Sequence, residues 1–132
     1  MKVFLDTVGV LALWDSTDQW HAPAAAAFTE LTRQQADLTS TTLVLMECAN
    51  AAARRPYRLT VERLWQSLKS SGRLIIPTDE DIDAAWTGYR RGDADQAGFV
   101  DNVSFVVMRR LGITHSFTND RHFRAAGFQA LF

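Results

Sequence analysis

Four acidic residues are the feature of this chain that points to chemistry. Asp6, Glu47 and Asp101 each lie within or beside an apolar stretch, and Asp120 ends the segment Ser116–Asn119, whereas acids are normally solvated and scattered. If the fold brings them together, two carboxylates about 4 Å apart repel each other by roughly 4 kcal/mol at an effective dielectric constant near 20. Such a cluster must take up protons or bind a cation. Ligands that are all oxygen favour Mg²⁺ or Mn²⁺.

Each acid also has an ordinary structural explanation. Asp6 could cap the helix that follows its strand, and Asp101 and Asp120 could simply favour the positive ends of their helices. Glu47 could pair with an arginine, although its neighbours three and four residues away offer no cation, and the same holds for Asp101. A cluster explains all four acids with one cause, and we therefore favour it.

The elements that must position these acids alternate along the chain between strands and helices. The pattern predicts an α/β fold with three layers, α/β/α, around a central, mostly parallel sheet of about five short strands. The expected strands are 3–5, 37–39, 73–76, 115–118 and 128–132. The expected helices are 8–14, 19–35, 41–55, 59–70, 79–91, 97–111 and 120–126, with a loop at 92–95.

Parallel sheets of this kind bind ligands beyond the carboxyl ends of their strands. Asp6 and Asp120 leave strands at that edge, Asp101 lies in the first turn of a helix, and Glu47 lies in the second turn after a strand. The topology therefore allows the four acids to face one crevice, although they are far apart in the sequence.

Composition limits the class of protein. The 132 residues predict one domain, and no apolar run approaches the ~20 residues that span a membrane. Cys48 is the only cysteine, which fits a reducing cytoplasm and a plain buried thiol. The net charge of −1 argues weakly against a nucleic-acid binder, but all the positive charge other than that of two lysines is arginine, which suits phosphate. Arginine pairs at 54–55, 90–91 and 109–110 could equally be solvated helix ends.

The four acids and their surroundings resemble the acidic motifs of the PIN domain, above all those of VapC-type ribonuclease toxins. The stretches that carry the resemblance are Phe4–Thr7, Leu45–Glu47, Val100–Met108 and Thr118–Phe123, and the region from 101 to 128 is the most specific. The match covers nearly the whole chain, so that residues 1–132 are expected to form a single PIN-like nuclease domain.

The resemblance implies a Mg²⁺- or Mn²⁺-dependent ribonuclease that cleaves RNA phosphodiester bonds, the toxin of a toxin–antitoxin pair in the cytoplasm. It implies Asp6, Glu47, Asp101 and Asp120 as catalytic and metal-binding residues. It also implies a small antitoxin partner and a homodimer, while the lack of a long apolar run argues against a membrane partner. Residues that could support the acids are Thr7, Ser104 and Asn119, and residues that could bind RNA are Arg121 and Arg124.

One departure from the family keeps an alternative open. Many PIN domains carry Ser or Asn two positions after the first Asp, and this chain has Val8. The alternative is a catalytically impaired PIN-like fold that binds RNA or a partner. A receiver-like signalling domain is disfavoured because no lysine follows Lys69, and a zinc site because the histidines lack ligand spacing. His122 is expected at the surface, as is the loop that holds Asp93 and Asp95.

Overall fold

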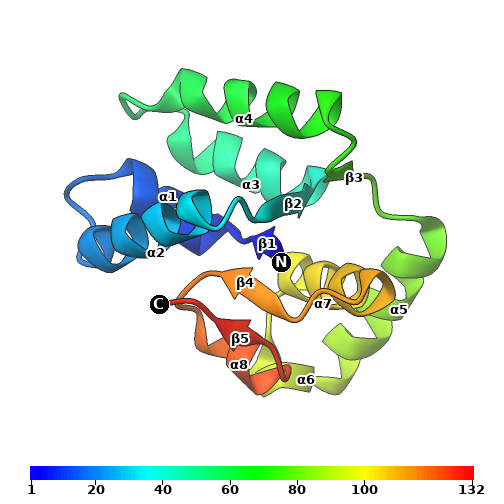
Figure 1. Cartoon of the computed structure of the whole chain (residues 1–132). Helices are drawn as coiled ribbons and strands as arrows, with labels where there is room; N and C mark the ends of the chain where they lie inside the picture. The colour runs from blue at the N-terminus through cyan, green and yellow to red at the C-terminus, as the bar shows by residue number, and fades with distance from the viewer.

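A computed structural model describes residues 1–132 and shows a five-stranded sheet at the centre of the molecule (Figure 1). Every neighbouring pair of strands is parallel, and the strand order is β3-β2-β1-β4-β5. The strands are β1 (Lys2–Leu5), β2 (Asp37–Thr41), β3 (Leu74–Ile75), β4 (His115–Phe117) and β5 (Gln129–Ala130). The expected parallel sheet is confirmed, and β3 and β5 at its edges are shorter than expected.

Helices cover both faces of the sheet and give the three expected layers. In Figure 1, α1 and α2 lie to the left of the sheet, and α5 and α7 lie to its right. None of the helices combines the length and apolar character that crossing a bilayer would require. The helices are α1 (Thr7–Trp14), α2 (His21–Arg33), α3 (Thr42–Ala52), α4 (Arg58–Ser70), α5 (Asp79–Arg91), α6 (Asp93–Gln96), α7 (Phe99–Leu111) and α8 (Arg121–Ala125).

Local signals in the sequence set several of these boundaries. Thr41 caps α3 by accepting a hydrogen bond from the Val44 amide, and Thr78 forms a capping box with Asp81 at the start of α5. Gly112 ends α7 in the left-handed conformation. Two expectations were wrong. The third helix ends at Ala52 rather than at residue 55, and where a loop was expected at 92–95, residues 93–96 form one short turn, α6, whose backbone is left-handed, with positive φ at 94–96.

The central strand β1 is buried as a continuous apolar run, since Val3, Phe4 and Leu5 are each at most 2% exposed. The helix α1, which follows β1, packs so closely on the sheet that a Cβ atom at Gly9 would lie 2.0 Å from the main-chain oxygen of Phe117. Only glycine fits there, and this approach brings the start of α1 against the end of β4.

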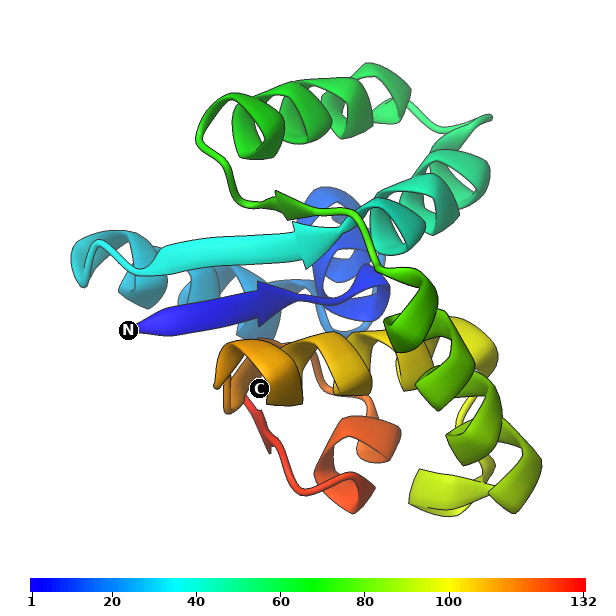
Figure 2. The same cartoon turned by 90° about the vertical axis from the view of Figure 1, so that its right-hand side faces the viewer.

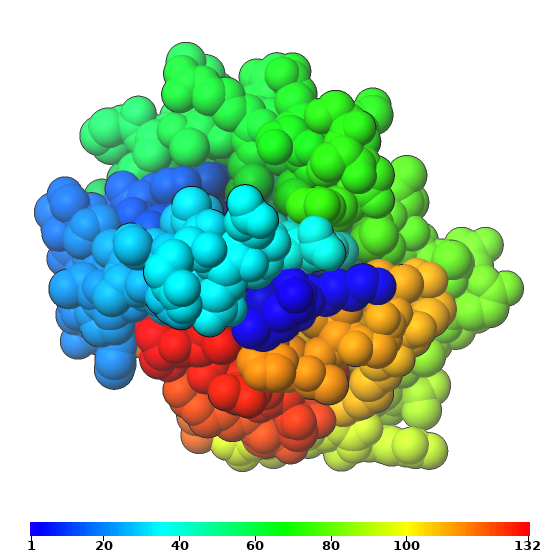
Figure 3. Space-filling model, viewed as in Figure 1, coloured from blue at the N-terminus to red at the C-terminus, as the bar shows by residue number.

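All carboxyl ends of the strands meet at one edge of the sheet. Figure 2 shows β1 and β2 running in the same direction into α1 and α3, with the amino-terminal end of α7 on the same side. Figure 3 shows the opposite edge, where the start of β1 reaches the surface between β2 and β4. The segments that hold the four acids therefore start or end at the edge that lies on the right in Figure 2.

Candidate functional site

Asp6 lies at the carboxyl end of β1 and is 2% exposed. Its side chain makes no capping hydrogen bond to α1, so the explanation of Asp6 as a helix cap was wrong. Its Oδ2 atom instead accepts a hydrogen bond of 2.8 Å from the hydroxyl of Thr118, which follows the neighbouring strand β4. The carboxylate is thus held at the sheet edge by a residue 112 positions away.

Asp101, Asp120 and His122 lie together at this edge. Each offers one ligand atom to a group in which all three atoms lie within 4.8 Å of one another. Asp120 caps α8 by accepting from the His122 amide at 2.9 Å, and its Oδ1 also lies 2.8 Å from Nδ1 of His122. Asp120 therefore serves as a helix cap and also lies in the cluster.

Glu47 approaches the cluster from α3. Its carboxylate accepts a hydrogen bond from the Thr7 hydroxyl, and its side chain lies at the surface. None of the four acids forms an ion pair with lysine or arginine, so the explanation of Glu47 as an arginine partner was wrong. Glu47 forms the solvent side of the site.

The pKa values follow from burial and mutual repulsion. Burial raises the pKa of Asp6 to about 8, with further increases from the charges of Asp101 and Asp120, while the Thr118 hydrogen bond lowers it. Burial raises the pKa of Asp101 to about 6, helped by the charges of Asp120 and Glu47 and opposed by His122. The four acids thus act on one another as a single electrostatic cluster, and no lysine or arginine compensates their charge.

The expected supporting residues differ in what they contact. Thr7 binds Glu47 and lies in the site. The Ser104 hydroxyl donates to the Val100 carbonyl of its own helix, and the Asn119 side chain makes no hydrogen bond, so neither holds an acid here. Val8, at the position of the family's usual Ser or Asn, is 40% exposed. Thr7 therefore provides the hydroxyl next to the first acid.

Two residues of the site were missed or misplaced by sequence reasoning. Thr118 binds Asp6, and its signal was only that it ends a predicted strand. His122 was expected at the surface, but its side chain is 23% exposed and its ring lies against Asp120. Cys48 is fully buried as expected, and burial raises the pKa of its thiol to about 12, which excludes a thiolate nucleophile at neutral pH.

The two arginines expected to bind RNA have different surroundings. Arg121 is 74% exposed and pairs with Asp95 at 2.7 Å. Such an exposed ion pair contributes about 0–1 kcal/mol, so a phosphate group can compete for this guanidinium. Arg124 donates to the main-chain oxygens of Asn119 and Phe132, which ties the end of the chain to α8. Arg124 thus has a structural role in this conformation.

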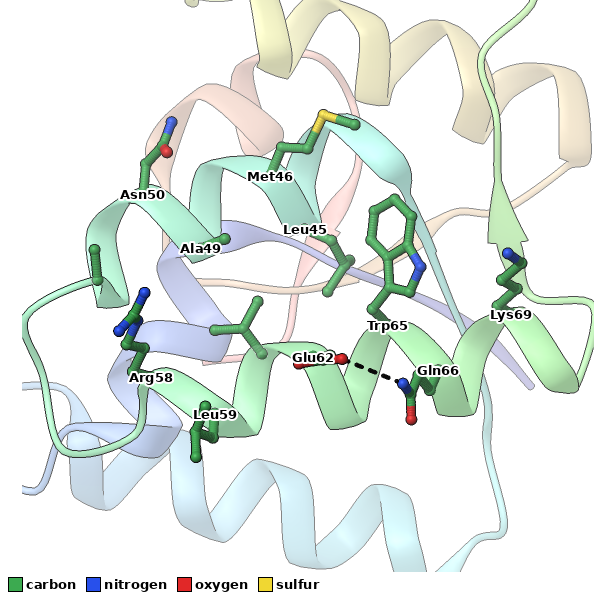
Figure 4. A pocket seen from close by; sticks show the side chains of 12 residues that line it. Leu45, Met46, Ala49, Asn50, Arg58, Leu59, Glu62, Trp65, Gln66 and Lys69 are labelled. Carbon is green, nitrogen blue, oxygen red and sulfur yellow. Dashed lines mark hydrogen bonds between the residues drawn. The ribbon is translucent and has the colours of Figure 1, made fainter.

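A groove of about 830 Å³ lies between α3 and α4 (Figure 4). Figure 4 shows Met46 and Asn50 on α3, with Trp65 and Lys69 along α4. Met46, which lines the groove on the α3 side, is 52% exposed and directly precedes Glu47 in the sequence. Leu59 at 63% exposure adds apolar surface on the α4 side.

Comparison with known proteins agrees with this geometry. A family model described as "PIN domain" matches residues 3–129. Two proteins from Mycobacterium tuberculosis strains CDC 1551 / Oshkosh and H37Rv, both named 23S rRNA-specific endonuclease VapC20, are 32% identical over 127 residues, which is 96% of this chain and 95% of theirs. The crystal structure of M. tuberculosis VapC20, described as a sarcin-ricin loop cleaving toxin, superposes with a TM-score of 0.77 at 26% identity. That match covers 96% of this chain and 95% of the other.

Proposed function

Because this chain belongs to the PIN domain family, we propose that it is a metal-dependent ribonuclease, the toxin of a toxin–antitoxin pair, whose site is formed by Asp6, Glu47, Asp101 and Asp120. One observation carries the proposal. Two buried or half-buried carboxyls, with pKa values raised to about 8 and about 6, share one sheet edge with two further acids and no lysine or arginine partner. A divalent cation removes this conflict of charges.

The donor set fits Mg²⁺ or Mn²⁺. The four acids present only carboxylate oxygens, which hard cations prefer, and the single nitrogen nearby is that of His122. We propose Asp6 and Asp101 as direct ligands, and Asp120 and Glu47 as ligands that bind directly or through water. When bound, the cation supplies positive charge for the attacked phosphate and the departing oxygen.

The residues of the chain have separate roles in this proposal. Thr118 orients Asp6, and Thr7 orients Glu47, each through a hydroxyl that donates to the carboxylate. Glu47, on the solvent side, orients the attacking water or accepts its proton. Arg121 exchanges the Asp95 carboxylate for an RNA phosphate, since its guanidinium suits phosphate geometry.

The substrate class follows from the relatives. They are named for 23S rRNA and for its sarcin-ricin loop, and we propose an accessible loop of ribosomal RNA as the first substrate to test. Unpaired loops expose the backbone that such a site must reach. We also propose that the protein acts in the cytoplasm and that residues 1–132 form a single nuclease domain. The alternative of an impaired fold that only binds is not favoured, because Thr7 holds Glu47 despite Val8.

We also propose that a small antitoxin binds in the groove between α3 and α4. The exposed apolar side chains of Met46 and Leu59 suit an apolar segment of that partner. A basic side chain of the same segment could reach the acidic cluster beside Met46 and displace the cation. A homodimer is the expected assembly of the free toxin.

The test is cleavage of a ribosomal RNA loop by the purified chain. We expect cleavage with Mg²⁺ or Mn²⁺ that stops with a chelator, and at least a 100-fold lower rate in Asp101→Asn with an unchanged circular dichroism spectrum. The matched control is Asp83→Asn, which removes an exposed acid of α5. Full activity of a folded Asp101→Asn protein would refute the assignment.

A further inference from the structure

Three aromatic side chains form a surface cluster beside the start of the helix that carries Asp101. Trp86 and Tyr89 lie on α5, and Phe99 begins α7. The Trp86 ring stacks on Phe99 with centroids 4.1 Å apart and planes 28° apart, and Tyr89 meets Trp86 edge-on at 5.6 Å. Trp86 is still 42% exposed and Tyr89 48%. Phe99 therefore covers one face of the Trp86 indole, and much of the rest of the side chain remains open to solvent.

Unpaired positive charge adjoins this aromatic cluster. Arg90 and Arg91 follow Tyr89, and neither forms an ion pair with a carboxylate. The two arginines, Tyr89 and Gln96 line a hollow of about 430 Å³ at the end of α5. Flat aromatic faces next to a basic groove are what proteins use to bind single-stranded nucleic acid without reading its sequence.

The aromatic cluster lies close to the acids along one helix. Phe99 and Asp101 are two residues apart, a rise of about 3 Å, and they point to different sides of α7. Phe99 packs against α5, whereas Asp101 faces Asp120 and His122. Figures 1 and 2 both show α5 lying along the amino-terminal part of α7. A strand of RNA cut at the acids would have this surface within reach of its neighbouring nucleotides.

We propose that the aromatic cluster is a stacking subsite for an unpaired nucleobase next to the cut bond. The base stacks on the solvent face of Trp86, and Arg90 and Arg91 bind the flanking phosphates. This inference rests on the proposed ribonuclease function and adds to it a device for holding looped RNA. Since every base has an aromatic face, the subsite favours unpaired over paired nucleotides and does not select a sequence.

The test measures binding of a short fluorescein-labelled single-stranded RNA to the full chain in an Asp101→Asn background, where the RNA stays intact. A second RNA with the same backbone carries abasic positions. We expect Trp86→Ala to weaken binding of the intact RNA roughly 10-fold and Trp86→Phe to keep most of the affinity. Trp20→Ala is the matched control, because Trp20 is 43% exposed and lies in the connection between α1 and α2, on the far side of the molecule from α5 in Figure 1.

The abasic RNA separates stacking from charge. The Asp101→Asn protein itself should bind abasic RNA roughly 10-fold more weakly than intact RNA, and Trp86→Ala should add no further loss. Equal affinity of this protein for the two RNAs overturns the proposal without any appeal to a Trp86 variant. A Trp86→Ala protein that changes from dimer to monomer in light scattering also overturns it, because the cluster would then belong to a subunit interface. RNA that is bound normally but never cut by the wild-type chain would contradict the ribonuclease assignment and leave the subsite standing.

Discussion

Replacing Asp6 by asparagine should stabilise the metal-free protein at alkaline pH. The pKa of Asp6 is about 8 in the folded chain against 3.8 in its ordinary state. Between these values the folded protein holds a proton that the unfolded chain has lost, so the free energy of unfolding falls as the pH rises from about 4 to about 8. Asparagine removes this loss because it never ionises, and its side-chain oxygen still accepts from Thr118.

The size of the effect follows from the shift. A gap of about 4 pKa units corresponds to an upper limit of roughly 6 kcal/mol at 1.36 kcal/mol per unit. Relaxation of the site and entry of water reduce this cost, and we expect about 3 kcal/mol at pH 8. For a chain of this length that is an increase in Tm of roughly 10 °C. Near pH 5 wild-type Asp6 is already protonated, and the two proteins should melt together.

The assay is thermal unfolding with a chelator or with excess Mg²⁺, at pH 5 and at pH 8. Mg²⁺ should raise the Tm of the wild-type protein at pH 8, since it binds the ionised carboxylates of the folded state only. Mg²⁺ should raise the Tm of the Asp6→Asn protein much less. The difference in Tm between the variant and the wild-type protein should therefore become smaller or change sign when Mg²⁺ is present. Asp83→Asn, at an exposed position, should follow the wild type throughout. The reasoning fails if Asp6→Asn is less stable than wild type at pH 8 without metal, or if the difference is the same at pH 5.

Two further changes test the contacts around the site. Thr118→Val keeps the shape of the buried side chain but removes the hydroxyl that donates to Asp6. We expect Mg²⁺ to bind this variant roughly 10-fold more weakly in calorimetry. An unchanged Mg²⁺ affinity would contradict the role of Thr118 in positioning Asp6. Gly9→Ala places a Cβ 2.0 Å from the Phe117 oxygen and should lower stability by about 3 kcal/mol in denaturant unfolding. Its control is Gly98→Ala, whose Cβ meets no atom within 4 Å and which should change stability by less than about 1 kcal/mol.

The order of elements was predictable because it depends on neighbours in the sequence. Apolar runs such as residues 3–5, capping residues such as Thr41 and Thr78, and the glycine at 112 act over a few positions, so the strands and helices followed from them. Errors occurred where such signals are weak. The left-handed turn α6 has positive φ at Ala94, Asp95 and Gln96, although none of these residues is glycine. The last strand contains only Gln129 and Ala130.

The four acids were found for the same local reason. Asp6, Glu47 and Asp101 stand out against apolar neighbours, and Asp120 follows a predicted strand. The rule that parallel strands share a carboxyl edge predicted where the acids would meet. Sequence alone could not assign the supporting contacts. Ser104 and Thr118 are both buried hydroxyls, yet Ser104 binds its own helix and Thr118 binds Asp6. That choice depends on side-chain direction in three dimensions.

The sequence by itself determined the alternation of strands and helices and the identity of the acids, because periodicity and residue type are properties of short segments. Only the tertiary structure decided that Asp6 is buried beside Asp101 and Asp120, that Thr118 binds it, and that Trp86 lies flat on Phe99. Burial and charge repulsion depend on distances between residues that are remote in the chain. Those distances exist only once β1, β4 and α7 have packed together.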